Sequence, residues 1–289
     1  MIVALITPFT RQGRVDTDGL RVLTQWLIEC EVDGLCPLGT TGESQKLDRE
    51  ERKLVLSTVI DEAKSDLPII AGTGAITTRD TITYTEDAKD LGACASLILP
   101  PWLFNFKPET ILSHYRTVSE NVDFPIILYN LPSAVGYSIP PEVVVEASRI
   151  DNVIGIKDSG ANMLYYQNII NQTSKEFNVI QGYASLFFPS LLLGGRTSIN
   201  GESNVAPKIA VDMYKSYMNG DYVTARRQHF KLVDLISVIL YGTLPVAIKE
   251  AMNIIGLPGG TTLPPATPLS KKEKRKLRET LIKIGLLKK

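Results

Sequence analysis

The chain has 289 residues, of which 44% are hydrophobic, and its 31 basic residues equal its 31 acidic ones. This balance gives no electrostatic reason to expect nucleic acid or an anionic membrane surface as a partner. Three cysteines and two histidines, at no metal-like spacing, argue against a disulfide framework and a zinc site, so we expect a reducing, cytoplasmic setting and no metal.

Short apolar runs alternate with longer amphipathic stretches along most of the chain. The expected strands lie at 3–8, 34–39, 67–74, 95–101, 124–132, 153–160, 177–183 and 196–203. The expected helices lie at 17–31, 48–64, 77–91, 108–121, 140–149, 162–176, 185–194 and 207–218. Strands and helices alternating at this spacing predict parallel βαβ units, and eight such units in order predict an α/β fold, the (β/α)₈ TIM barrel.

The remainder of the chain, 220–289, has apolar residues at helical spacing. We expect it to be a C-terminal helical extension of the same domain as the catalytic barrel, 1–219. Its basic end, 271–289, is also compatible with a nuclear signal or a membrane-surface helix, but the charge balance elsewhere favours a solvated last helix. The N-terminus lacks signal-peptide features, and no apolar run is long enough for a membrane span.

Active sites of such barrels lie at the C-terminal ends of the strands, so those ends carry the candidate residues. They read "GTTGES", "YNLPSAVG", "IKDSG", "QGY" and "INGESN". Lys157 stands out because it ends an apolar strand, and lysine is rarely buried unless paired. Each candidate also has a structural interpretation: an ion pair of Lys157 with Asp158, a packed Tyr129, or glycines that serve a tight turn.

Together these residues fit the chemistry of an imine. Burial disfavours the charged form of Lys157, and a neutral amine attacks carbonyl carbons to form a Schiff base. The protonated imine withdraws electrons from the neighbouring carbon–carbon bonds, and a phenol such as Tyr129 exchanges the protons. Backbone amides and hydroxyls of the turn at Thr40 and Thr41 can hold a substrate carboxylate.

The motifs "ALITPF", "GTTGES", "YNLP" and "GIKDSG" resemble those of the N-acetylneuraminate lyase and dihydrodipicolinate synthase family of class I pyruvate aldolases, in the same order along the whole chain. The resemblance implies a homotetramer, a small-molecule substrate, a lysine–pyruvate Schiff base and no metal or organic cofactor. It matches Lys157 to the Schiff-base lysine and Tyr129 to the acid/base tyrosine. Thr40 and Thr41 match the pair that binds the carboxylate.

Two further matched positions, Gly182 and Ile199, line the pyruvyl pocket in the family. Two other positions depart from its pattern. Ala134 stands where dihydrodipicolinate synthases usually carry an arginine for the aldehyde carboxylate, and a methyl group cannot replace a guanidinium. After the fourth strand the family often has tyrosines of the proton relay, whereas this chain has Trp102 and Phe104.

The other groups expected at the barrel mouth are mostly neutral and able to form hydrogen bonds. They are Ser44, Gln45, Asn105, Ser133, Tyr137, Ser159, Asn200 and Ser203, with Lys46 and Lys107 as the main basic candidates. Leu131 replaces an aromatic residue of relatives that use phosphorylated sugar acids. We therefore expect a hydroxylated, non-phosphorylated tail, which is closest to the 2-keto-3-deoxygluconate aldolase activity of the Entner–Doudoroff pathway.

This lyase activity cleaves 2-keto-3-deoxygluconate, or its galactonate epimer, to pyruvate and glyceraldehyde. The main alternative is dihydrodipicolinate synthase (4-hydroxy-tetrahydrodipicolinate synthase), and Ala134 argues against it. N-acetylneuraminate lyase and sugar-acid dehydratases share the imine and remain open. A non-catalytic sugar-acid-binding relative is less well supported, because a binding protein has no need of the pair Lys157 and Tyr129.

Overall fold

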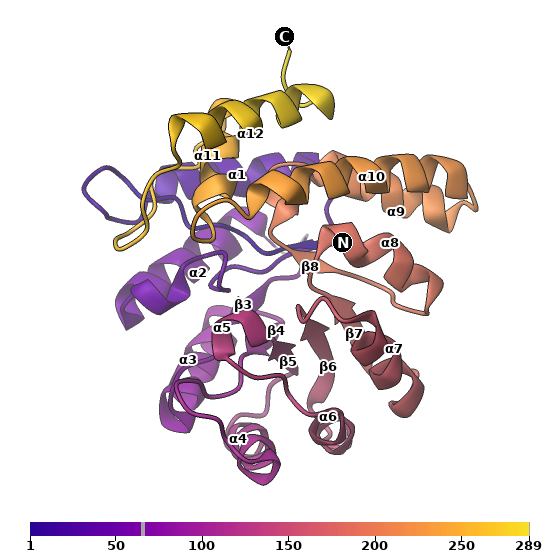
Figure 1. Cartoon of the computed structure of the whole chain (residues 1–289). Helices are drawn as coiled ribbons and strands as arrows, with labels where there is room; N and C mark the ends of the chain where they lie inside the picture. The colour runs from indigo at the N-terminus through magenta and orange to yellow at the C-terminus, as the bar shows by residue number, and fades with distance from the viewer. Residues whose placement is uncertain (65–66, 289) are drawn as a thin grey trace.

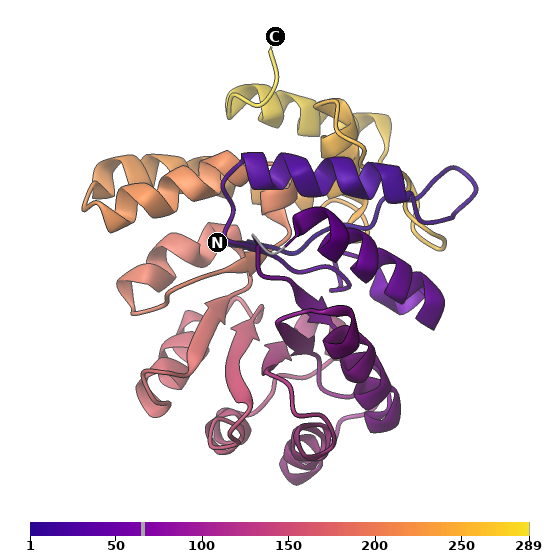
Figure 2. The ribbon, with the colours of Figure 1, turned by 180° about the vertical axis from the view of Figure 1, so that it is seen from behind.

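The computed structural model describes residues 1–64 and 67–288 of the chain. Parallel strands lie at the centre and helices surround them on all sides (Figure 1). The view from behind shows the same ring of helices around the strands (Figure 2). The predicted (β/α)₈ barrel with C-terminal helices is confirmed.

The barrel is closed from two ladders of short parallel strands. The strands are β1 (Ile2–Val3), β2 (Gly34–Leu35), β3 (Ile70–Gly72), β4 (Ala95–Ile98), β5 (Ile126–Asn130), β6 (Val153–Asp158), β7 (Asn178–Gln181) and β8 (Ile199–Asn200). They pair in the orders β2-β1-β8 and β3-β4-β5-β6-β7. Single parallel bridges, Leu35 with Ile69 and Gln181 with Ser198, join the two ladders and close the barrel.

Longer helices follow the strands, and several of them begin at residues that favour a helix start. They are α1 (Thr17–Glu29), α2 (Arg49–Ala63), α3 (Thr78–Leu91), α4 (Pro108–Asn121), α6 (Pro141–Ala147), α7 (Met163–Gln172), α8 (Ala184–Leu192) and α9 (Pro207–Met218). Asp48 and Glu51 form a capping box at α2, and Thr77 Oγ1 accepts the Asp80 amide at the start of α3, at 3.1 Å. Pro108 occupies the first turn of α4, where its missing N–H costs nothing.

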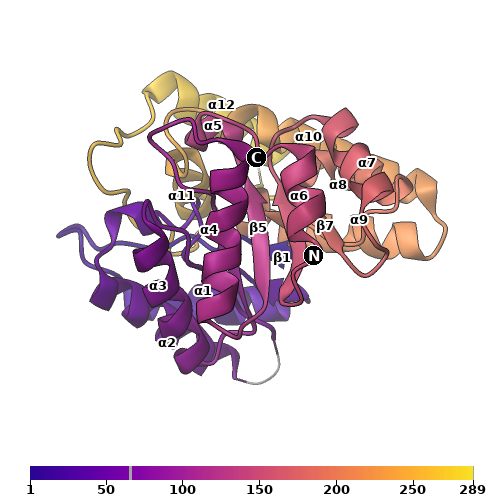
Figure 3. The ribbon, with the colours of Figure 1, turned by 90° about the horizontal axis from the view of Figure 1, so that it is seen from below.

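Three further helices follow the barrel: α10 (Tyr222–Ile239), α11 (Val246–Ile254) and α12 (Lys271–Lys283). Helix α10 packs on α8 and α9, and α12 packs on α10 and α11. Seen from below, α10 and α12 lie at the same end of the barrel as α5 (Pro132–Val135), the short helix that directly follows β5 (Figure 3). The extension therefore lies beside the C-terminal ends of the strands.

The structure differs from the predicted elements in the length of every strand and in the short helices. The strands predicted at 3–8 and 34–39 are only Ile2–Val3 and Gly34–Leu35. Helix α5 was not expected, because four residues are too few to show helical periodicity. The eighth strand is shorter than the predicted 196–203, and Glu202–Asn204 form a 3₁₀ helix, η2, instead. In the described part of the chain, no helix is long and apolar enough to cross a membrane.

Candidate active site

A cavity of about 370 Å³ opens at the C-terminal ends of the strands. The loops after the strands form one part of its wall, and α10 and α11 form the other. Most of the predicted site residues line it, namely Lys157, Tyr129, Thr40, Thr41, Gly182, Ser159 and Leu131. These residues come from the ends of four different strands, β2, β5, β6 and β7, which the barrel brings to one place.

Lys157 and Tyr129 are neighbours across two adjacent strands. Their Cα atoms are partners in the register of β6 and β5. The Nζ atom of Lys157 lies 4.2 Å from the centroid of the Tyr129 ring, within cation–π range. Both residues are buried, 4% and 6% exposed, and both line the cavity. Because side chains alternate along a strand, Lys157 faces the barrel interior while the preceding Ile156 packs under the helices.

The structural alternative for Lys157, an ion pair with Asp158, is not formed. Asp158 accepts hydrogen bonds from Asn130 Nδ2 at 2.7 Å and from the Gly160 amide at 3.0 Å. Burial raises the pKa of Asp158, and these two hydrogen bonds oppose that rise. Among the ion pairs of residues 1–64 and 67–288, none includes Lys157. Lys157 is therefore buried at the cavity wall without an ion pair to hold its amine, so the amine is available to a ligand.

Thr40 and Thr41 lie in the turn between β2 and the 3₁₀ helix η1 (Ser44–Lys46), and both line the cavity. The Thr7 hydroxyl stabilises this turn by donating a hydrogen bond to the Gly42 carbonyl at 2.8 Å. The Oγ1 atom of Thr40 is buried and has no hydrogen-bond partner in the described part of the chain. A buried hydroxyl at a cavity wall without a partner is suited to bind a polar group of a ligand.

A buried ion-pair network joins this turn to the C-terminal extension. Glu43 adopts a left-handed conformation, with φ 55°, and its Oε1 accepts from Lys249 Nζ at 2.6 Å. Its Oε2 accepts from Lys46 Nζ at 2.8 Å. Lys249 also donates to the Thr261 carbonyl at 2.6 Å and lies 4.2 Å from the ring centroid of Phe9. Burial lowers the pKa of Lys249 to about 8, although Glu43 opposes this. Helix α11 thereby fixes one end of the threonine turn.

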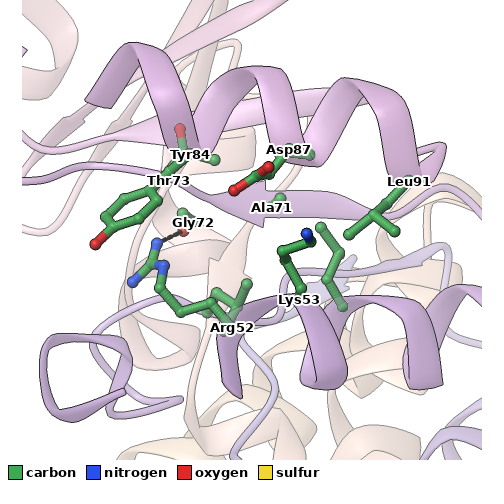
Figure 4. Close-up of a pocket in the computed structure, with 11 residues that line it drawn as sticks. Arg52, Lys53, Ala71, Gly72, Thr73, Tyr84, Asp87 and Leu91 are labelled. Atoms are coloured by element: carbon green, nitrogen blue, oxygen red, sulfur yellow. Dashed lines mark hydrogen bonds between the residues drawn. The ribbon is translucent and has the colours of Figure 1, made fainter. Parts of the chain in front are cut away.

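Arg52 of α2 holds the turn from the other side. Its guanidinium donates to the Ser44 carbonyl at 3.0 Å. It also donates to the Gly72 carbonyl at 2.7 Å and lies 4.2 Å from the centroid of the Tyr84 ring (Figure 4). Burial lowers the pKa of Arg52 to about 10. The cavity around it measures about 10 Å³, at most the room for one water, so we interpret it as a packing feature.

Gly182 lets the ends of β6 and β7 approach each other. A Cβ atom at this position would lie 1.9 Å from Ser159 Oγ and 2.7 Å from the Asp158 carbonyl oxygen. The Gly182 amide donates to that same carbonyl at 2.8 Å. The close approach is what leaves Ser159 in the cavity wall beside Lys157.

The outer part of the cavity is walled by α5 on one side and by the extension on the other. The extension contributes apolar side chains, which are Ile236, Ile239, Leu240, Leu244 and Ile248. Helix α5 contributes Ser133 and Ala134. Apart from Lys157, no lysine or arginine of the described residues lines the cavity.

One carboxyl group in the wall was not singled out from the sequence. Glu202, at the start of η2, is 3% exposed, and its Oε1 accepts from the Ala184 amide at 3.2 Å. Burial raises the pKa of Glu202 to about 7, opposed by nearby backbone amides and by the charge of Lys157. Burial, and to a lesser degree Glu202, also raises the pKa of Tyr183, its neighbour in the wall. The sequence indicates that the loop "INGESN" follows the last strand, but it gives no sign that the side chain of Glu202 faces the cavity.

Two predicted site residues are not part of the cavity wall. Ile199 is buried in the barrel interior. Asn200 is used within its own loop, because its Nδ2 donates to Ser198 Oγ at 2.8 Å and its Oδ1 accepts from Ser203 Oγ at 2.7 Å. Several other groups expected at the mouth are also outside the wall, namely Ser44, Gln45, Lys46, Asn105, Lys107, Tyr137 and Ser203. The mouth is therefore less polar than predicted.

The two histidines, His114 and His229, lie outside the cavity wall. His114 is buried, with its Nδ1 2.9 Å from Thr78 Oγ1, and burial lowers its pKa to about 4. Within residues 1–64 and 67–288, no group of three or more His, Cys, Asp or Glu side chains is arranged to hold a metal ion.

Comparison with known proteins gives consistent matches over nearly the whole chain. The model of the dihydrodipicolinate synthetase family matches residues 1–284. A protein of Methanosarcina mazei named 4-hydroxy-tetrahydrodipicolinate synthase is 35% identical over 285 residues, which are 98% of this chain and 97% of the relative.

Solved structures of the same fold match equally completely. The dihydrodipicolinate synthase of Aquifex aeolicus has a TM-score of 0.95 and 33% identity, covering 100% of this chain and 99% of that one. YagE, a prophage protein of the dihydrodipicolinic acid synthase family from E. coli K12 solved in complex with pyruvate, has a TM-score of 0.95 and 31% identity. That match covers 99% of this chain and 98% of YagE.

Proposed function

The chain belongs to the dihydrodipicolinate synthetase family, and on that premise we propose that it is a pyruvate-dependent class I aldolase with Lys157 as the Schiff-base residue. The family works through a lysine–pyruvate Schiff base and uses no external cofactor. The observation that carries the assignment is that Lys157 is buried, lines the cavity beside Tyr129, and has no ion-pair partner among the described residues.

The reaction follows from the groups at the strand ends. The neutral amine of Lys157 adds to the keto carbon of the substrate and expels its oxygen as water, which leaves a protonated imine. In the cleavage direction, the bond between C3 and C4 breaks as the C4 hydroxyl loses its proton, and the electron pair moves into the imine as an enamine. Protonation of the enamine and hydrolysis of the imine then release pyruvate.

Tyr129 and the threonine turn have separate roles in this scheme. The Tyr129 hydroxyl exchanges the proton with the C4 oxygen. Thr40 and Thr41, with the amides of their turn, bind the carboxylate beside the keto carbon, and the buried hydroxyl of Thr40 is available for it. Ser159 and Gly182 form the wall next to the pyruvyl half.

The preferred aldehyde half is uncharged. Ala134 lies where synthases of the family carry an arginine, and the rest of the outer wall consists of apolar side chains, neutral polar side chains such as Ser133 and Thr243, and Glu202. A carboxylate or phosphate would find no charge-assisted partner there, and each such hydrogen bond is worth roughly 1.5–3 kcal/mol. The favoured substrates are 2-keto-3-deoxygluconate and its galactonate epimer, which give pyruvate and glyceraldehyde.

The second candidate is 4-hydroxy-tetrahydrodipicolinate synthase, which the names of similar proteins favour. This function shares the imine at Lys157 and differs in the aldehyde, aspartate semialdehyde. Its carboxylate would have to bind without an arginine at position 134.

One preparation of the protein tests both candidates. Pyruvate release is measured from 2-keto-3-deoxygluconate, its galactonate epimer and the 6-phosphate of each, and condensation of pyruvate with aspartate semialdehyde is measured in parallel. We expect kcat/KM for the non-phosphorylated acids to exceed that for the phosphates by at least about tenfold. Efficient condensation with aspartate semialdehyde and no cleavage would overturn the first candidate in favour of the second.

The oligomeric state remains a prediction. The resemblance implies a homotetramer, and the loop after β4 exposes Leu103 and Phe104, which are 69% and 71% accessible in the single chain. Large apolar side chains exposed in a loop of a single chain are typical of a surface that another subunit covers. Light scattering of the purified protein measures the mass of the assembly.

A further inference from the structure

Glu202 is the one acidic side chain of the described residues in the wall of the cavity. It is held there rather than solvated, because its Oε1 accepts the Ala184 amide at the start of α8 and only 3% of the residue is exposed. A carboxylate has two oxygens and about four acceptor positions, so this single bond leaves it able to accept from a ligand. The catalytic scheme above makes no use of it.

The surroundings of Glu202 make its charge effective. The opposite wall consists of apolar side chains of α10 and α11, such as Ile239 and Ile248. Low polarity strengthens electrostatic effects relative to water. The charged and titratable groups near Glu202 are Lys157 from β6 and Tyr183 after β7. Burial raises the pKa of Tyr183, and the charges of Tyr129 and Asp158 raise it further. The protonated imine at Lys157 loses its positive charge when it becomes the enamine, and no other lysine or arginine of the described cavity wall then offsets the carboxylate.

Resting on the proposed function, we propose that Glu202 determines the specificity for the aldehyde half of the substrate. Its carboxylate accepts a hydrogen bond from a hydroxyl of that half and repels aldehydes that carry their own carboxylate or phosphate. Hydrogen bonds matched to a substrate hydroxyl discriminate strongly in buried sites, because unpaired polar groups are costly there. Glu202 thus selects against anions actively, where Ala134 only fails to bind them.

The test compares two aldehydes in condensation with pyruvate: glyceraldehyde, which is neutral and hydroxylated, and succinic semialdehyde, which carries a carboxylate. The variant Glu202→Gln keeps an oxygen for the Ala184 amide and removes the charge. We expect the ratio of kcat/KM for glyceraldehyde to that for succinic semialdehyde to fall at least about tenfold in this variant. The control, Glu120→Gln, changes an exposed carboxylate at the far end of α4 and should leave the ratio unchanged.

The unmodified protein provides a second measurement that does not depend on a variant. The pKa of about 7 means that Glu202 is mostly protonated at pH 6 and ionised at pH 8.5. The preference for glyceraldehyde should therefore rise between these pH values in the parent and stay flat in Glu202→Gln. Both aldehydes react with the same pyruvate enamine, so the effect of pH on imine formation cancels in the ratio, and Tyr183 stays neutral because its pKa is raised.

The outcomes separate this inference from the proposed function. Borohydride trapping of pyruvate on Lys157 is measured in the parent and in both variants. If trapping is retained but the ratio neither changes in Glu202→Gln nor varies with pH in the parent, the inference about Glu202 is wrong and the aldolase assignment stands. If the parent shows no adduct at Lys157, the proposed function itself fails. A fall in the ratio that accompanies normal trapping supports both.

Discussion

Lys157 and Tyr129 are partners in the register of β6 and β5, and the amine nitrogen lies 4.2 Å from the centre of the phenol ring. The two groups that the chemistry requires are therefore fixed by backbone pairing of adjacent strands rather than by mobile loops. Because each strand presents alternate residues to the barrel interior, the pairing also ensures that both side chains face the same cavity.

Replacing Tyr129 by Phe keeps the ring beside Lys157 and removes only the hydroxyl. General acid–base groups typically contribute about 10²–10⁴-fold, so kcat should fall by that amount while borohydride trapping of pyruvate remains detectable. Steady-state kinetics and mass spectrometry measure the two effects. Tyr222→Phe, which removes an exposed hydroxyl, is the control. A Tyr129→Phe enzyme as fast as the parent would show that another group transfers the proton.

Ala134→Arg introduces a cation into the outer cavity wall. A charge-assisted hydrogen bond to the carboxylate of aspartate semialdehyde should raise kcat/KM for that aldehyde by roughly tenfold or more. Ala134→Gln adds a similarly long but neutral side chain and should not reproduce the gain. If the unmodified protein already condenses aspartate semialdehyde efficiently and arginine adds nothing, position 134 does not decide the choice of aldehyde.

Gly182→Ala forces a Cβ atom to within 2.7 Å of the Asp158 carbonyl oxygen, which belongs to the backbone and cannot rotate away. Overpacking of this kind typically costs about 1–3 kcal/mol, and here it also displaces the strand that carries Lys157. We expect a lower free energy of urea unfolding together with slower imine formation. At Gly39 a Cβ atom would meet nothing within 4 Å, so Gly39→Ala serves as the control for stability.

Lys249→Met leaves the buried Glu43 with Lys46 as its remaining ion-pair partner. Removing one member of a buried ion pair typically costs roughly 3–5 kcal/mol, because the other charge stays buried. Urea unfolding should show this loss, and KM for pyruvate should rise as the threonine turn loosens. The control variant breaks an exposed ion pair, that of Lys276 with Glu279. Lys276→Met should change the free energy of unfolding by no more than about 1 kcal/mol. Equal effects of both variants would mean that the buried network contributes little.

The alternation of apolar runs and amphipathic stretches was sufficient to predict the fold. Each run is short because a barrel strand needs only a few residues, and each is apolar because both of its faces are covered. The helix predicted at 48–64 is observed as α2, and the structure adds the capping box of Asp48 and Glu51 at its start. Helix α5 and the 3₁₀ helix at Glu202–Asn204 were not predicted, because they span too few residues to give a period.

The site was predictable where strand alternation fixes the direction of a side chain, as for Lys157 and Tyr129. It was not predictable in the loops, where nothing in the sequence says which side chains turn inward. Asn200 was expected in the wall but bonds to Ser198 and Ser203, whereas Glu202, two residues later, lines the cavity. The pair of Glu43 and Lys249 joins positions 206 residues apart, and no local pattern reveals such a contact.

The most direct test of the account is to identify the lysine that forms the imine. The protein is incubated with pyruvate and borohydride, digested and analysed by mass spectrometry. We predict a reduced pyruvyl adduct on Lys157, loss of activity in proportion to its formation, and the absence of both adduct and activity in Lys157→Ala. An adduct on Lys249, which is also buried, or no adduct while pyruvate is still released from the substrate, would contradict the assignment of Lys157.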